Sequence, residues 1–189
     1  MNNETIFIQI ASYRDPELPK TIQSCLENAN KPENLRFGIC RQSKEGDDFD
    51  RLGDLENDPR FRIIEVDWRD ARGVCWARNL VQNEYKGETY TLQIDSHHRF
   101  VPGWDSICID SIKQLQKKGH KKPLLTAYLP SYDPSNDPGK RINEPWFMEF
   151  DRFIPEGAIF FLPSTIPDYH NKIYPVRSRF YSAHFCFTL

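Results

Sequence analysis

Short apolar runs alternate along the chain with segments whose apolar residues recur every three or four positions. The runs predict buried strands, and the longer spacing predicts helices with one apolar face. The expected strands span residues 5–11, 35–40, 61–66, 90–95, 123–129 and 180–189. The expected helices lie between residues 16 and 29, 74 and 86, and 104 and 118. This order predicts an α/β fold with a mostly parallel sheet flanked by helices.

The segments between these elements contain many turn-forming residues. Residues 43–60 predict a long surface loop with one helical turn, and residues 130–145 predict a mobile loop. The aromatic segment 146–162 predicts one or two further strands. No internal repeat or linker divides the chain, so we expect residues 1–189 to form a single domain.

Polar residues follow four of the expected strands at their carboxyl ends. In parallel sheets these ends meet at one edge, and ligands bind outside that edge. We therefore expect the polar groups to gather around one site. They are Ser12, Tyr13 and Arg14, then Arg41 and Gln42, then Asp67, and finally Asp95, Ser96 and His97.

The strand at residues 90–95 ends abruptly in Asp95-Ser96-His97-His98. Residues two apart in an extended chain point to the same side, so Asp95 and His97 can face one point. A carboxylate and an imidazole are reasonable ligands for a divalent cation. The alternative is an Asp that caps a turn beside a surface His, and the spacing alone favours that alternative. His98 is expected to point away, in a structural or exposed role.

Composition narrows the classes of protein to which the chain can belong. It is 39% hydrophobic and 28% charged with a net charge of -2, which is ordinary for a globular domain and argues against a general nucleic-acid binder. The five cysteines form no CxxC pair, which suggests buried thiols in a reducing compartment. We see no leader and no membrane span, and expect a cytoplasmic protein.

Three motifs together point to a known family. They are IASYRDPELPKTIQSCL near the start, then ARGVCWARN, then LQIDSHHRFVPGWD. In this order they resemble the cytoplasmic Skp1-type prolyl-hydroxyl N-acetylglucosaminyltransferases, whose nucleotide-sugar-binding fold is GT-A. The resemblance runs over essentially the whole chain and is strongest through residue 104. Family members continue past residue 189, so we expect the chain to lack the C-terminal acceptor part.

The resemblance implies a metal-dependent, retaining glycosyltransferase. Its donor would be a UDP-sugar, most simply UDP-GlcNAc, and its acceptor a hydroxyl group on a protein or glycan. Asp95 and His97 would hold Mn²⁺ or Mg²⁺ as a DxD-like motif. The expected nucleotide-binding residues are Ser12, Tyr13, Arg14, Asp67, Arg72, Arg78 and Asp95. Arg78 follows a helix start, where anions bind well, and phosphate binding is slightly preferred over the alternative, a surface ion pair.

Other residues have structural interpretations. Asp15 and Asp105 are expected to cap helices, and Trp104 to lie in the core. The aromatic residues Trp146, Phe147 and Phe150 could form a sugar or acceptor platform, but core packing is the preferred interpretation. No partner is evident for His120, His170 or His184.

Two other functions are compatible with the same residues. One is a non-catalytic domain that binds a nucleotide sugar or glycan. The other is a nucleotidyltransferase, which would use the same sheet and cation but release pyrophosphate. The motifs do not identify the acceptor, the sugar or the oligomeric state.

Overall fold

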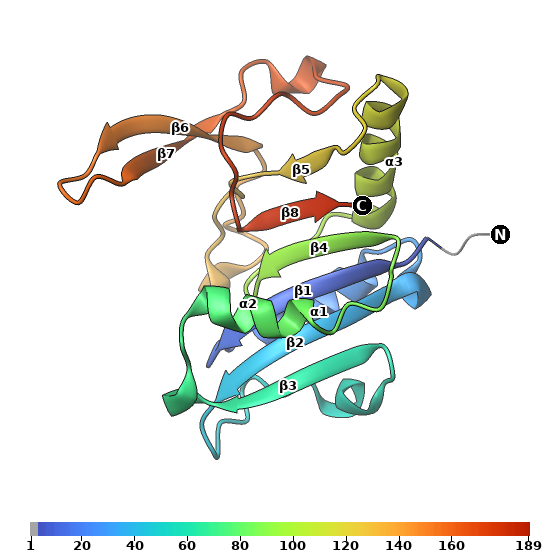
Figure 1. Ribbon diagram of the computed structural model, residues 1–189, viewed down its shortest axis with the longest axis vertical. Coiled ribbons are helices and arrows are strands. Elements are labelled where there is room, and N and C mark those ends of the chain that lie inside the picture. The colour runs from blue at the N-terminus through green and yellow to red at the C-terminus, as the bar shows by residue number, and fades with distance from the viewer. Residues whose placement is uncertain (1–3) are drawn as a thin grey trace.

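The computed structural model describes residues 4–189 (Figure 1). Its strands are β1 (Ile6–Tyr13), β2 (Leu35–Ser43), β3 (Phe61–Asp67), β4 (Tyr90–Asp95), β5 (Leu124–Thr126), β6 (Trp146–Phe153), β7 (Ile159–Thr165) and β8 (Phe185–Thr188). Its α-helices are α1 (Leu18–Glu27), α2 (Val74–Gln82) and α3 (Trp104–Lys117). A short 3₁₀ helix at Gly53–Asn57 is the helical turn expected in the loop after β2.

Six strands form one sheet in the order β3-β2-β1-β4-β8-β5. The four strands from β3 to β4 are parallel, whereas β8 runs antiparallel to both β4 and β5. The mostly parallel α/β sheet predicted from the sequence is therefore confirmed. The last strand is shorter than expected, and the sequence pattern did not indicate its reversed direction.

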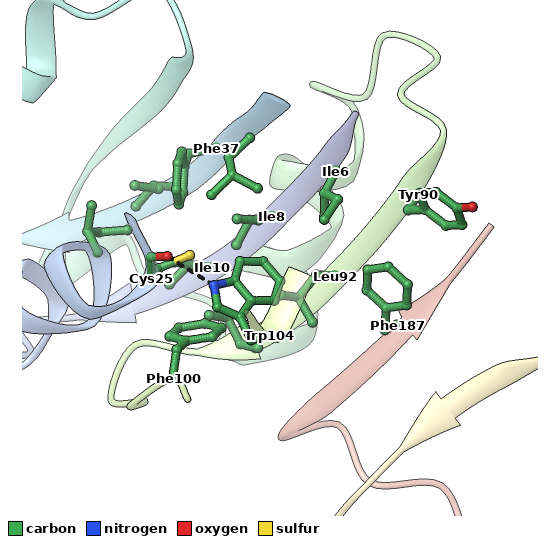
Figure 2. Packing of buried hydrophobic residues seen from close by; sticks show 14 of the residues in the cluster. Ile6, Ile8, Ile10, Cys25, Phe37, Tyr90, Leu92, Phe100, Trp104 and Phe187 are labelled. Carbon is green, nitrogen blue, oxygen red and sulfur yellow. Dashed lines mark hydrogen bonds between the residues drawn. The ribbon is translucent and has the colours of Figure 1, made fainter. Parts of the chain in front are cut away.

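The main core lies between the sheet and the helices α1 and α3. Ile6, Ile8 and Ile10 of β1 share one face with the residues opposite them on β2 and β4, and all are buried. Trp104 of α3 packs into this core, as expected, and its indole Nε1 donates to the carbonyl of Cys25 at 3.0 Å (Figure 2). Alternation along each strand thus fixes which side chains face these helices.

Helix α2 covers the opposite face of the sheet. Phe7 and Cys40 pack there against Ala77 and Val81, and all four side chains are fully buried. Gly38 allows this close packing, because a Cβ atom at this position would lie 2.6 Å from Phe7 Cζ and 2.9 Å from Val81 Cγ1. The close packing of α2 against the sheet therefore requires glycine at position 38.

The two aspartates expected to cap helices differ in their contacts. Asp15 lies three residues before Leu18, where α1 begins, and its Oδ1 atom accepts from the backbone N–H of Glu17 at 2.9 Å. Helix α3 begins after Gly103, whereas the buried carboxylate of Asp105 accepts from the backbone N–H groups of Asn30 and Lys31, both at 2.9 Å. Asp105 therefore joins α3 to the loop after α1, a long-range contact that local sequence patterns do not encode.

Strands β6 and β7 form a separate two-stranded hairpin that projects from the main sheet (Figure 1). The expected strands in the aromatic segment are therefore present. Their aromatic side chains are not core residues, however: Trp146 and Phe147 are only half-buried and Phe150 is 48% exposed. The preferred interpretation of these residues is wrong, because neither buried core cluster of the described chain includes a residue of the hairpin.

Arg99 anchors the loop at residues 130–145 to the main domain. Its guanidinium forms ion pairs with Glu17, before α1, and with Asp137 of the loop. It also lies over the ring of Tyr132, with Cζ 4.6 Å from the ring centroid. The Arg99 and Glu17 side chains are only 8% and 9% exposed, so each buried charge is stabilised by the other.

Replacing Gly38 with alanine is expected to lower the free energy of unfolding by roughly 2 kcal/mol, because the added methyl group overlaps Phe7 and Val81. Urea unfolding measures this change. The double variant Gly38→Ala/Phe7→Leu should recover part of the loss, because the shorter side chain vacates the space. A stability loss that the second substitution leaves unrelieved would contradict this packing.

Replacing Arg99 with alanine is expected to cost about 2 kcal/mol of unfolding free energy, because Glu17 and Asp137 lose a charged hydrogen-bond donor and Glu17 keeps only Lys20 and the Tyr132 hydroxyl. Urea unfolding measures the loss, and faster amide exchange in residues 130–141 reports release of the loop. Arg141→Ala is the matched control, since this more exposed arginine also pairs with Asp137 and should cost less than about 1 kcal/mol. Equal losses in the two variants would rule out the anchoring role of Arg99.

Candidate active site

The carboxyl ends of the parallel strands bring the expected polar residues to one edge of the sheet. Strand β1 lies between β2 and β4, so Ala11 is paired with Asp95 and Ser12 with Arg41. The loop after β1 therefore lies beside the end of β4. The chain approaches this edge a third time just before β8.

Asp95 is the centre of a charged cluster. Arg78 Nη2 of α2 donates to Asp95 Oδ1 at 2.8 Å and to the carbonyl of Ala183 at 3.2 Å. Arg78 thereby joins α2, β4 and the segment before β8. Its Nε atom is buried and has no hydrogen-bond partner among the described residues. The structure thus brings two of the predicted site residues, Asp95 and Arg78, into direct contact.

His184 completes this cluster. Its Nε2 atom lies 3.6 Å from Asp95 Oδ2, and its Nδ1 atom lies 3.2 Å from the Ser182 hydroxyl. The ring of Tyr128 packs edge-on against it at 4.7 Å between centroids. The expectation that His184 has no partner is wrong. Only the antiparallel pairing of β8 with β4 brings the two residues together, and no local sequence signal reports that pairing.

His97 is held by Asp15 rather than by Asp95. Its Nδ1 atom lies 2.8 Å from Asp15 Oδ2, which also accepts from the Ser96 hydroxyl at 2.6 Å. Burial opposes ionisation of Asp15, but the hydrogen bonds from His97 and Ser96 prevail and lower its pKa to about 2. The same hydrogen bond raises the pKa of His97 above its ordinary value. The His97 side chain remains 57% exposed.

His98 has the structural role expected from the sequence. The residue is 7% exposed, and its Nδ1 atom is 2.9 Å from the carbonyl oxygen of Asp95. Its backbone N–H donates to the Thr21 hydroxyl of α1 at 2.8 Å. Burial lowers the pKa of His98 to about 4, so the ring stays neutral near pH 7.

The residues at the end of β1 and in the loop after it differ in how accessible their side chains are. Tyr13 is 52% exposed at the strand end, whereas Ser12 is fully buried and its hydroxyl has no partner among the described residues. Arg14 has a φ of 47°, and its guanidinium pairs with Asp47 at 2.6 Å. The ring of Tyr13 is thus accessible, while the Arg14 charge is already paired.

Asp67 and Arg72 make local contacts. Asp67 accepts from both the backbone and the side chain of Arg69, as an ordinary turn aspartate does, and these bonds lower its pKa to about 2. The Arg72 guanidinium lies 5.9 Å from the ring centroid of Trp76. Within residues 4–189 no hydrogen bond or ion pair joins Asp67 or Arg72 to Asp95.

The donor atoms at this edge are of the kinds that a divalent cation shared with a substrate would use. Nowhere in residues 4–189 do three His, Cys, Asp or Glu side chains already converge to hold a metal ion alone. Asp95 Oδ2, His184 Nε2 and the free nitrogen of His97 nevertheless supply the oxygen and imidazole atoms that such cations accept. Cations bound by few side chains normally take their remaining ligands from substrate phosphates and water.

A cavity of about 240 Å³ adjoins His184. Tyr128 and Ser182, the two residues that contact the His184 ring, both line it, and so do Trp146 and Phe147. Every side chain in its wall is uncharged. The half-buried aromatic residues Trp146 and Phe147 at the base of the β6–β7 hairpin therefore form one side of a cavity next to the Asp95 cluster.

No helix in the described part of the chain is both long enough and apolar enough to cross a membrane.

Two solved structures align with part of this chain. Residues 1–349 of TarS from S. aureus align with a TM-score of 0.52 and 11% identity, covering 66% of this chain and 35% of that one. The mannosyltransferase PcManGT from Pyrobaculum calidifontis, solved with GDP-Man and Mn²⁺, aligns with a TM-score of 0.47 and 17% identity, covering 69% of this chain and 36% of that one. The chain thus spans about a third of the length of these structures.

None of the curated proteins compared with the chain matches it. A protein-family match, in contrast, covers residues 5–54 and 51–189 and carries the description "Glycosyltransferase (GlcNAc)". The fold is the GT-A-like α/β architecture expected from the motifs. Because the family match extends over essentially the whole described chain, this protein belongs to the Glycosyltransferase (GlcNAc) family.

Proposed function

We propose that this chain is the donor-binding domain of a metal-dependent, retaining glycosyltransferase that moves GlcNAc from UDP-GlcNAc to an acceptor hydroxyl. The observation that carries the proposal is the position of Asp95 at the end of β4, between Arg78 of α2 and His184 before β8. Within the Glycosyltransferase (GlcNAc) family, the whole string from Asp95 to Asp105, DSHHRFVPGWD, favours a Skp1-type enzyme.

Asp95 and His97 would hold Mn²⁺ or Mg²⁺, and His184, whose Nε2 atom lies 3.6 Å from Asp95 Oδ2, would be a further ligand. When bound, the cation supplies positive charge opposite the diphosphate leaving group. Arg78 adds a fixed positive charge at the same edge. Its buried Nε–H has no partner within the described chain, and an unpaired buried donor is costly, so a diphosphate oxygen would satisfy it.

The remaining predicted residues would hold the nucleotide. Tyr13 is exposed and can stack on the uracil ring, with Ser12 and Arg14 shaping the loop beneath it. Asp67 would accept a hydrogen bond from the uracil or ribose, and Arg72 would support the phosphates near the start of α2. These roles place the base over β1 and the diphosphate over β4.

The transfer step needs no dedicated side-chain base in this domain. In a retaining transfer the departing phosphate can take the proton of the acceptor hydroxyl while the sugar moves to that oxygen. The contribution of the protein is then electrostatic, because Arg78 stabilises charge that develops on the leaving group. The uncharged cavity beside Tyr128 and His184 is the place where an acceptor would lie.

The cysteines support a cytoplasmic location. All five are free thiols, and four of them are buried. Proteins of oxidising compartments generally pair such residues, so unpaired buried thiols fit a reducing environment.

The Asp95→Asn variant tests the site directly. It keeps the volume of the side chain but removes its charge, so we expect Mn²⁺-dependent UDP binding to fall at least about tenfold. Calorimetry with UDP and Mn²⁺ measures binding, and a screen of UDP-sugars that detects UDP release identifies the donor. Unchanged binding in the variant would refute the assignment of Asp95.

The donor screen also separates the alternatives. UDP release that depends on Mn²⁺ is expected for a glycosyltransferase. Binding without any release would indicate a non-catalytic domain, and release of pyrophosphate would indicate a nucleotidyltransferase.

The His184→Ala variant tests the residue that only the structure revealed. We expect Mn²⁺-dependent UDP binding to weaken by about tenfold, because the cation loses an imidazole beside Asp95. His120→Ala is the matched control, since His120 is exposed beyond α3 and far in sequence from the site. If both variants bound UDP and Mn²⁺ as the unmodified protein does, His184 would have no part in the site.

A further inference from the structure

Asp15 connects two parts of the site that are distant in the sequence. It belongs to the loop after β1, yet its Oδ2 atom accepts from the Ser96 hydroxyl at 2.6 Å and contacts His97 Nδ1 at 2.8 Å. Its other oxygen, Oδ1, accepts from the backbone N–H of Glu17 at 2.9 Å. Both carboxylate oxygens therefore have defined partners, and the orientation of the carboxylate is fixed.

This arrangement determines which nitrogen of His97 carries the proton. An ionised carboxylate can only accept hydrogen bonds, so the neutral imidazole must donate from Nδ1 to Asp15. The Nε2 atom is then left with a lone pair. No partner for it occurs among the residues from 4 to 189, and the His97 side chain is 57% exposed.

We propose that Asp15 is a positioning residue that holds His97 in the Nδ1–H tautomer, so that its Nε2 atom can bind the cation. Carboxylates that accept a hydrogen bond from the second nitrogen of a histidine ligand are a general feature of metal sites. The inference rests on the proposed function, because it assumes that His97 is a cation ligand. It adds a role for a residue that is expected from the sequence to be a simple helix cap.

The position of Asp15 also links nucleotide and cation binding. Asp15 follows Tyr13 and Arg14 in the loop after β1, and its carboxylate contacts Ser96 and His97 after β4. A nucleotide seated on the β1 loop would therefore contact the same short segment that orients His97. Asp15 couples the two ends of the donor site through one side chain.

A purely structural role for Asp15 makes a different prediction from a positioning role. If Asp15 only fastened the β1 loop to β4, asparagine would replace it better than alanine, because asparagine keeps its size and hydrogen bonding. A positioning role predicts the reverse order. In Asp15→Asn the Glu17 N–H retains the amide oxygen at the Oδ1 position, so the NH₂ group faces His97.

That NH₂ group would donate to His97 Nδ1 and force the proton onto Nε2, which blocks cation binding. In Asp15→Ala neither tautomer is favoured, so part of the population can still bind. We expect Mn²⁺ affinity in the presence of UDP to decrease in the order unmodified protein, Asp15→Ala, Asp15→Asn. The Asn variant should lose about 10- to 100-fold, the usual effect of disrupting such a partner.

Two measurements on the whole chain test the proposal. Long-range ¹H–¹⁵N spectra of the histidine rings, recorded without metal at a pH where His97 is neutral, report the tautomer. Electron paramagnetic resonance of free Mn²⁺ in the presence of UDP reports the affinity. Asp58→Asn is the matched control, since Asp58 also accepts a backbone and a side-chain hydrogen bond but lies at the start of β3. It should change neither the tautomer nor the affinity.

The outcomes are distinct. The Nδ1–H tautomer in the unmodified protein and the Nε2–H tautomer in Asp15→Asn would support the proposal. The Nε2–H tautomer in the unmodified protein overturns it, and this result needs no variant to fold. Tighter Mn²⁺ binding by Asp15→Asn than by Asp15→Ala also overturns it. Failure of the unmodified protein to bind Mn²⁺ with UDP would instead contradict the proposed function.

Discussion

The parallel pairing of β1 with β4 is the constraint on which the site depends. It sets Ala11 opposite Asp95, so the loop after β1 and the Asp95-Ser96-His97 segment leave the sheet side by side. Each strand alternates between the α2 face and the face of α1 and α3. Asp95 consequently meets Arg78 of α2, while the Ser96 carbonyl accepts from Thr21 of α1. A shift of one residue in this register would exchange those faces and dismantle both sets of contacts.

Two carboxylates organise the groups at this edge in different ways. Asp95 Oδ1 accepts a hydrogen bond from Arg78, and Asp95 Oδ2 lies beside His184 Nε2. Asp15 accepts hydrogen bonds from the Glu17 backbone N–H and the Ser96 hydroxyl, and it contacts His97 Nδ1. These contacts fix the orientation of its carboxylate. Under the proposed function, Asp95 would attract the cation and Asp15 would orient one of its ligands. A site for a cation shared with a diphosphate would use both kinds of carboxylate.

The sequence was sufficient to predict features that depend on local periodicity. The parallel strands and the three helices followed from apolar spacing, and the polar residues after β1 and β4 do lie at one edge of the sheet. Contacts between distant segments were not predictable in this way. Asp15 looks like a helix cap because a proline follows it, yet its main partners are 81 and 82 positions away. The contact between His184 and Asp95 could not be predicted, because nothing near His184 in the sequence indicates that β8 pairs antiparallel with β4.

The central claim concerns where a cation lies relative to β4, and crystallography with UDP and Mn²⁺ tests it most directly. Anomalous diffraction locates manganese independently of the protein coordinates. The proposed function predicts one strong peak within coordination distance of the Asp95 carboxylate and the His97 ring, with the diphosphate of UDP bound to the same ion. A UDP molecule bound elsewhere, or a manganese peak remote from the end of β4, would contradict it.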